Sequence, residues 1–420
     1  MPVHLLLMFI IVGEGGINLG QRQVKPFSDS VSILLVINLN NGYISHSNRC
    51  SNDVRSAVSY LLVYSNQINA LYRRFHNCYL LEHLHHFQLT NQPNYPTVSF
   101  TANYLYNPPM RWNFHGLIIE GKTNDASLEA SWRRSFGSRP LSTAEPNLIY
   151  HLDIVEEVVP PPAGEPQFRQ EQLIEYYLKD EMVVAHFPRY GRLELDLSNG
   201  RTNGRIIRAA LDIYGVLEDI IAIGLSPHLR RRNMFLIHAF AAAYEGHAAL
   251  LVGGVGAGKT TTGMSLLNAG WQLLSNDSPI LTPDGDVLSY PGVLAAYNDT
   301  FGRFPATTHL ETAAPEKKGR AKITIEAEAV WPNIWLDAAP ASAIFFPRIE
   351  SRTDHEVELL YPPDALRRLM PHAIEQWDRE MIGRHLLLLR TLVEKTPAYM
   401  LRLGPDVLAI PDVIGNWVIG

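Results

Sequence analysis

Cysteine is almost absent from this sequence. Its 420 residues include only Cys50 and Cys78, with no Cys-x-x-Cys pair and no His/Cys grouping at zinc-finger spacing. A disulfide framework or a structural zinc site would need such groupings. The composition therefore argues against both, and a reducing cytoplasm is the expected compartment.

Long apolar runs are missing as well. No stretch approaches the roughly 18 apolar residues that a membrane-spanning helix needs. The apolar segment 5–12 has no Lys or Arg before it and no clear small-residue cleavage site after it. It therefore fits a buried strand better than a signal peptide. We expect a soluble protein without a membrane partner.

An excess of positive charge is also lacking. The chain has 36 Lys and Arg against 42 Asp and Glu, which gives a formal net charge of -6. Surfaces that bind nucleic acid or anionic membranes usually show as a net basic domain or as long basic runs. The one compact basic cluster, Arg230-Arg231-Arg232, is interpreted as a solvated connector. No nucleic-acid partner is expected.

Charged residues are scarce before Met110. Residues 1–109 hold only 10 of the 78 charged residues. This atypical extension could be a small domain, a disordered appendage, or a segment upstream of a true start at Met110, and we favour the last. Its clustered histidines lack an evident carboxylate partner for a metal site. The cluster consists of His76, His83, His85 and His86.

The remaining chain has an ordinary globular pattern. Short β-type runs separated by Pro- and Gly-containing turns predict a small, antiparallel, β-rich module over 110–200. The runs are 114–120, 148–154, 182–187 and 192–197. Apolar residues at helical spacing from Ile206 to Ile221 predict a helix, after which strands alternate with helices. The sequence therefore predicts an α/β fold, with 201–420 as a second domain.

A glycine-rich loop stands between a predicted strand, 248–252, and a predicted helix, 261–269. Glycines let successive backbone N–H groups surround phosphates, and the helix adds its positive end. The pattern predicts a site for ATP or GTP, in which Lys259 reaches the β- and γ-phosphates and Thr260 ligates Mg²⁺. The nucleotide-binding residues would be Gly253, Gly254, Val255, Gly256, Ala257, Gly258, Lys259, Thr260 and Thr261.

Two residues outside the loop are candidates for the chemistry. Asp277 ends a strand-like run, and the separation from Lys259 allows one helix and a return beside the loop strand. Asp277 would then lie near the γ-phosphate, where it could hold Mg²⁺ or accept a proton from an attacking hydroxyl. The alternative is an Asp that caps the turn before Pro279. His238 precedes Gly253 by fifteen residues, and alone it would be an ordinary core histidine.

Several classes of phosphate-loop protein are excluded by their missing motifs. The chain has no Leu-Ser-Gly-Gly-Gln signature of ABC transporters and no Asn-Lys-x-Asp motif of GTPases. The Gly-rich loop and His-Arg-Asp motif of eukaryotic-type protein kinases are absent too.

The combined pattern resembles the HPr kinase/phosphorylase family and its HPr kinase-related serine kinases, such as those in lasso-peptide gene clusters. The matching residues are His238, Tyr244-Glu245-Gly246, the strand 248–252, the loop 253–260 and the run 273–277. The resemblance covers about 110–420 and is specific around 235–285. It implies a P-loop kinase core of the HPr kinase/phosphoenolpyruvate carboxykinase type, with a small β-rich N-terminal module.

This resemblance also implies a function. Family members use ATP and Mg²⁺ to phosphorylate a serine of a peptide or protein. The protein could also form a homo-oligomer. Asp277 would be the base or a metal ligand, with Lys259 on the phosphates and His238 assisting. Asn276 stands where the family usually has a first aspartate. We favour retained activity through Asp277, and the alternative is a non-catalytic nucleotide sensor.

Two further expectations concern the acceptor side. The transferred phosphate needs a basic group, and a Gly-containing segment offers candidates for a mobile finger or merely a solvated loop: Lys317, Lys318, Arg320 and Lys322. The HPr-binding signature is not recognisable, so HPr itself is not the expected substrate.

A metabolic enzyme related to phosphoenolpyruvate carboxykinase is a third interpretation of the whole sequence. It would need carboxylate-binding arginines.

Overall fold

The computed structural model describes the backbone of two strands near the N-terminus, residues 110–310 except 138, 172, 214 and 291, and residues 322–419. The chain forms two compact units, Met1–Asn107 and Pro108–Gly420. In the first unit, β1 (Leu6–Gly13) and β2 (Gly16–Gln23) form an antiparallel hairpin, which confirms a strand in the apolar segment. The four clustered histidines, as well as Lys317, Lys318 and Arg320, lie outside the described residues.

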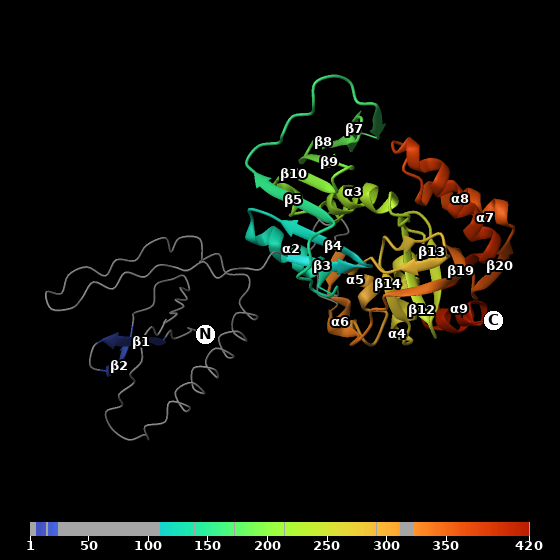
Figure 1. The fold of residues 1–420 in the computed structure, drawn as a ribbon. Coiled ribbons are helices and arrows are strands. Elements are labelled where there is room, and N and C mark those ends of the chain that lie inside the picture. The colour runs from blue at the N-terminus through green and yellow to red at the C-terminus, as the bar shows by residue number, and fades with distance from the viewer. Residues whose placement is uncertain are drawn as a thin grey trace. The chain divides into compact units, whose positions relative to one another are not determined.

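An eight-stranded sheet begins the second unit (Figure 1). Its order is β3-β4-β5-β10-β9-β8-β7-β6. Its strands are β3 (Met110–Phe114), β4 (Leu117–Lys122), β5 (Leu148–Val155), β6 (Phe168–Gln170), β7 (Ile174–Lys179), β8 (Met182–Phe187), β9 (Gly191–Asp196) and β10 (Arg201–Ile207). The antiparallel prediction is wrong for β5, which runs parallel to β4 and to β10. The reason is helix α2 (Ala126–Phe136), which returns the chain so that β5 runs in the direction of β4.

The helix predicted from Ile206 begins later. Residues 201–207 form β10, in which Thr202, Gly204 and Ile206 are buried on alternate positions. A strand paired on both sides explains this alternation, because successive side chains point to opposite faces. The 3₁₀ turn η1 (Arg208–Ala210) follows, and helix α3 runs over Val216–Arg230, with Pro227 inside its last turn.

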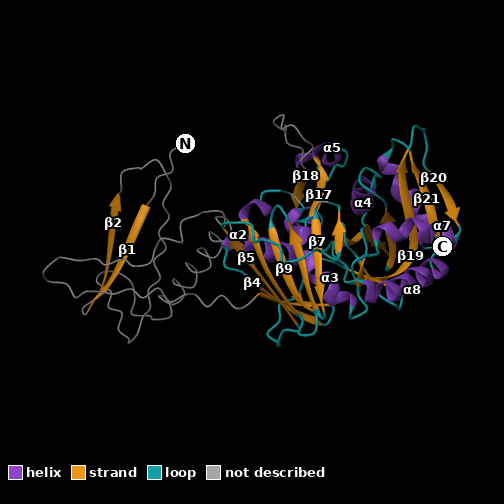
Figure 2. Cartoon of the chain, turned by 90° about the horizontal axis from the view of Figure 1, so that it is seen from above, coloured by secondary structure: helices purple, strands orange, loops and turns teal. Residues whose placement is uncertain are grey.

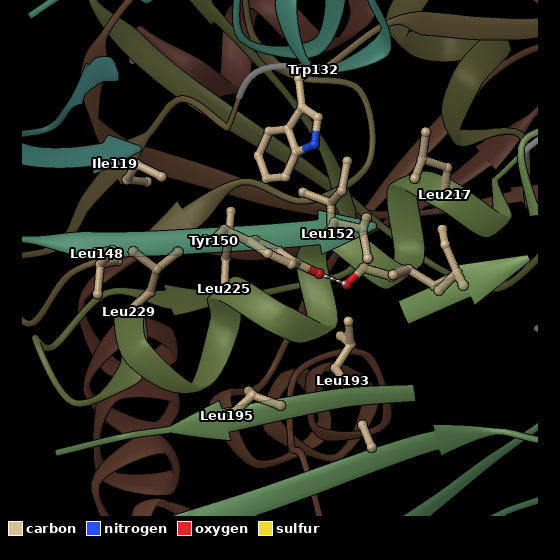
Figure 3. Close-up of a cluster of buried hydrophobic side chains, with 14 of the residues drawn as sticks. Ile119, Trp132, Leu148, Tyr150, Leu152, Leu193, Leu195, Leu217, Leu225 and Leu229 are labelled. Carbon is tan, nitrogen blue, oxygen red and sulfur yellow. Dashed lines mark hydrogen bonds between the residues drawn. The ribbon is translucent and has the colours of Figure 1, made fainter. Parts of the chain in front are cut away.

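Helix α3 packs closely on this sheet (Figure 3). The Tyr150 hydroxyl of β5 donates a hydrogen bond to the Ile220 carbonyl of the helix at 2.8 Å. At Gly224, a Cβ atom would stand 2.4 Å from the Tyr150 hydroxyl oxygen, so only glycine permits this approach. Leu225 and Leu229 complete the contact and are almost fully buried. Their burial supplies hydrophobic stabilisation that fixes α3 against the sheet.

A nine-stranded sheet forms the second half of this unit. Its main path is β11-β15-β16-β19-β13-β12-β14, and β21 joins β19 to the edge strand β20. The strands are β11 (Phe235–Leu236), β12 (Ala239–Tyr244), β13 (His247–Val252), β14 (Gln272–Ser275), β15 (Ile280–Leu281), β16 (Asp286–Leu288), β19 (Ala338–Ile349), β20 (Glu356–Leu360) and β21 (Ala398–Leu403). The predicted mixed α/β class is therefore confirmed.

Helices cover both faces of the second sheet (Figure 2). One face packs against α7 (Pro362–Leu369) and α8 (Arg379–Lys395), and the other against α4 (Lys259–Asn268) and α9 (Ile410–Val418). The smaller elements are β17 (Leu294–Tyr297), β18 (Lys322–Ile325), α5 (Asn298–Phe301), α6 (Ala327–Val330), η2 (Thr308–Leu310), η3 (Met370–His372) and η4 (Val407–Ala409). Within the described part of the chain, no helix has the length and apolar character needed to span a bilayer.

Two of the three arginines at the end of α3, Arg230 and Arg231, are not solvated, which corrects the sequence interpretation, whereas Arg232 is exposed. Arg230 and Asp378 are each 3% exposed, and the Arg230 Nη2 and Asp378 Oδ2 atoms lie 2.8 Å apart. Arg231 pairs with the same carboxylate at 3.1 Å. The neighbouring Trp377 stacks on Tyr176 of β7 with ring centroids 4.8 Å apart. This network attaches the segment before α8 to α3 and to the first sheet.

Candidate active site

The three sequence features converge at one edge of the second sheet. The acidic strand β14 was expected beside the loop strand β13, but β12 lies between them. Because β12 is antiparallel to both, its beginning lies at the same edge as the ends of β13 and β14. His238 precedes β12, the loop follows β13 and Asp277 follows β14. The backbone confirms this meeting, since the Ala239 N–H donates to the Asp277 carbonyl at 3.1 Å.

The loop has the strand–loop–helix context that the motif requires. Gly256 and Gly258 adopt left-handed φ values of 81° and 100°. At Gly258, a Cβ atom would also stand 2.9 Å from Leu403 Cδ1. Helix α4 begins at Lys259 without a side-chain cap, which leaves its first N–H groups available for an anion. The local geometry therefore suits phosphate binding.

Lys259 folds back onto the loop. Its side chain is largely buried, and its ammonium donates to the Gly253 carbonyl and, at 3.3 Å, to the Gly254 carbonyl. The same Nζ lies 3.2 Å from His238 Nε2. Burial lowers the Lys259 pKa, while the negative charge of Asp277 raises it. Incoming phosphates would replace the two carbonyls as partners of the ammonium group.

His238 links Lys259 to Asp277. Its Nδ1 lies 3.3 Å from Asp277 Oδ1. Although 44% of the side chain is exposed, surrounding protein desolvates the ring and lowers its pKa; Lys259 acts in the same direction and Asp277 opposes it. In its neutral form, His238 accepts from Lys259 at Nε2, which leaves the Nδ1–H group beside the Asp277 carboxylate. Lys259, His238 and Asp277 therefore form one chain of polar contacts.

The turn after β14 is held by Ser275. Its buried hydroxyl oxygen accepts from the Ser278 N–H at 3.0 Å and from the Asp277 N–H at 3.4 Å. Between them, the Asn276 Oδ1 is buried and has no hydrogen-bond partner among the described residues. A buried oxygen without a donor is costly unless another group satisfies it. The site therefore has an acceptor oxygen available to a cation or a ligand donor.

The oxygen groups at this edge fit Mg²⁺. The Thr260 hydroxyl, the Asp277 carboxylate and the orphaned Asn276 amide oxygen are all ligands of the kind that Mg²⁺ prefers. Over the described ranges, no group of three or more His, Cys, Asp or Glu is arranged to hold a metal ion. Mg²⁺ usually takes one or two carboxylates and completes its shell with water and substrate phosphates.

Sequence reasoning missed a basic recess beside the loop. A cavity of about 310 Å³ borders Gly253, Gly254 and Ala257, and its polar lining is Arg348, Arg368 and His372. Arg348 lies near the end of β19, Arg368 in α7 and His372 in η3. No spacing signal connects them to the loop, because they follow it by about 90 residues or more and the sheet brings them back.

Sequence reasoning also missed Asp219, which lies in the first turn of α3. It is exposed to solvent, yet protein around it desolvates the carboxylate, and the charges of Asp277 and Glu218 add to the effect. Together they raise the pKa of Asp219 to about 6.

Lys322 is one of the basic residues predicted for the acceptor side. Its positive charge lowers the pKa of both His238 and Lys259, so it acts electrostatically on the site.

Comparisons with known proteins give no family assignment. No protein-family model matches the chain, and no curated protein matches it. Among solved structures, the HPr(Ser) kinase/phosphatase from Coxiella burnetii is similar at 12% sequence identity and a TM-score of 0.24. The match covers 43% of this chain and 88% of that chain. Similarity this low supports no conclusion about family or activity.

Proposed function

We propose that this protein is an ATP- or GTP-dependent, Mg²⁺-dependent serine kinase with a P-loop core of the HPr kinase/phosphoenolpyruvate carboxykinase type. Its acceptor is a serine hydroxyl of a peptide or protein. The observation that carries the proposal is the chain from Lys259 through His238 to Asp277, which joins a phosphate-binding loop to a carboxylate. A carboxylate in this position supports phosphoryl transfer, because it can accept the proton of an attacking hydroxyl.

The proposed reaction follows from these positions. The N–H groups of the loop and the Lys259 ammonium bind the phosphates and stabilise their charge. The serine oxygen attacks the γ-phosphorus, the bond from that phosphorus to the β,γ-bridging oxygen breaks, and the nucleoside diphosphate leaves. Asp277 accepts the hydroxyl proton, and His238 holds its carboxylate in place. Bound Mg²⁺ would supply further neutralisation of phosphate charge.

A nucleotide sensor without catalysis is the second candidate. It is favoured by Asn276, which lacks the charge of an aspartate. A backbone contact supports it as well, because the His238 N–H donates to the His372 carbonyl at 2.6 Å. Five residues later, Trp377 stacks on Tyr176 of the first sheet. Through these contacts, nucleotide binding at the loop would affect the conformation of the first sheet.

The substitution Asn276→Asp separates the two candidates. The unmodified protein is incubated with γ-labelled ATP, Mg²⁺ and serine peptides, and label on the peptide is counted. As a kinase, it should transfer label, and N276D should change the rate by no more than roughly tenfold, about 1.4 kcal/mol of barrier. Asn203→Asp, at an exposed position in β10 on the other sheet, controls for added charge.

The opposite result supports the sensor. In that case the unmodified protein binds ATP without transferring label, and N276D gains transfer that Asn203→Asp does not.

A further inference from the structure

The basic recess lies on the γ-phosphate side of the loop. It borders Gly253 and Gly254, the residues whose carbonyls hold the Lys259 ammonium. It is not lined by Thr260 or Thr261 at the start of α4. The lysine of this motif serves the β- and γ-phosphates. An occupant of the recess would therefore lie beside the phosphoryl group to be transferred, not beside the nucleoside.

Positive charge in the recess exceeds the negative charge around it. Arg348 is 67% exposed, and its Nε lies 3.4 Å from the carboxylate of Glu350. Glu350 also lies 3.1 Å from Arg402 and 3.8 Å from Arg352, which pair with Glu356 as well. Among the described residues, none that lines the recess is acidic. Within the described part of the chain, Arg368 makes no ion pair, whereas its neighbour Arg367 lies 3.5 Å from Asp364. The recess can therefore accept an anion.

His372 adds a polar group that carries no charge at neutral pH. Burial lowers its pKa, and the positive charge of Lys259 lowers it further. Its ring lies 6.1 Å from the His238 ring, centroid to centroid. A neutral imidazole can donate a hydrogen bond to an anionic oxygen without adding to the desolvation cost of another cation. Two guanidinium groups and this ring suit a planar carboxylate or a phosphate, which arginine binds bidentately.

We propose that the recess binds an anionic group of the acceptor, a carboxylate or a phosphate carried close to the reactive serine. This inference deepens the proposed kinase function and rests on it. It assigns Arg348 and Arg368 to acceptor recognition and leaves the nucleotide to the loop.

The test uses the full chain and three fluorescent serine peptides of equal length. Their flanking residues are uncharged, aspartate or phosphoserine. Binding is measured with Mg²⁺ and a non-hydrolysable ATP analogue, and transfer is measured separately with γ-labelled ATP. The variants are Arg348→Gln and Arg368→Gln. Arg367→Gln is the matched control, because it lies on the same helix but does not line the recess.

We expect an anionic peptide to bind at least about tenfold more tightly than the uncharged one. Each recess variant should remove most of this preference and raise the peptide KM more than it lowers kcat, with the affinity for the ATP analogue unchanged. Arg367→Gln should behave as the unmodified protein. The better of the aspartate and phosphoserine peptides identifies the anion.

Two results would overturn the inference. One is equal binding of all three peptides, and the other is loss of ATP-analogue affinity in the recess variants, which would assign the arginines to the nucleotide. A failure of the kinase proposal looks different: anionic peptides would still bind through Arg348 and Arg368, but no label would be transferred.

Discussion

Asp277→Asn is expected to lower the rate of phosphoryl transfer by roughly 10²–10⁴-fold, the usual contribution of a positioned general base. The amide keeps the size of the side chain and still presents an oxygen to His238, whose Nδ1 lies 3.3 Å from the carboxylate. It cannot accept the proton of an attacking hydroxyl. Turnover is measured with γ-labelled ATP and a serine peptide, and nucleotide affinity by calorimetry with and without Mg²⁺.

The control is Asp284→Asn in the exposed turn between β15 and β16, which removes the same charge away from the loop. It should leave turnover unchanged. Retained turnover in Asp277→Asn would show that Asp277 is not the base. A parallel loss of MgATP affinity, with metal-free affinity retained, would instead assign this carboxylate to the metal ion.

Asp378→Ala is expected to lower the free energy of unfolding by about 3–5 kcal/mol, as is usual when one partner of a buried ion pair is removed. Arg230 would remain buried and lose its carboxylate, whose Oδ2 accepts from Arg230 Nε at 2.9 Å. Arg231 would lose the same partner. The change is measured by urea unfolding followed by circular dichroism and tryptophan fluorescence.

Asp364→Ala is the matched control. Its carboxylate lies 3.5 Å from Arg367, and both side chains are more than half exposed. Exposed pairs contribute about 0–1 kcal/mol. A loss below about 1 kcal/mol in Asp378→Ala as well would mean that the network between α3 and the segment before α8 does not stabilise the fold.

Local sequence signals predicted the loop and its surroundings well. The two-residue turn Glu245-Gly246 joins β12 to β13 with φ values of 50° and 82°, which glycine and few other residues adopt readily. The strand before the loop and the helix after it also lie where the pattern placed them. These features are determined by residues close together in the sequence, so a local sequence pattern can predict them.

Features that depend on distant residues were not predictable in this way. The prediction of a helix from Ile206 was wrong because this residue lies in β10, which pairs with β5 on one side and β9 on the other. The arginine cluster was misinterpreted because Asp378 follows Arg230 by 148 residues. The sequence also did not predict that β14 pairs with β12 and not with β13, because the order of strands in a sheet depends on pairing between separate segments. The basic recess depends on the same order, since parallel strands bring Arg348 back to the loop.

Equilibrium binding of nucleotides by calorimetry tests the central claim most directly, because it asks whether the loop recognises a triphosphate. MgATP should bind at least roughly 100-fold more tightly than AMP, about 2.7 kcal/mol, since AMP has no β- or γ-phosphate for Lys259. Lys259→Met should bring the affinity for MgATP close to that for AMP. Equal affinity for AMP and MgATP, or unchanged MgATP affinity in Lys259→Met, would contradict a phosphate site centred on this loop.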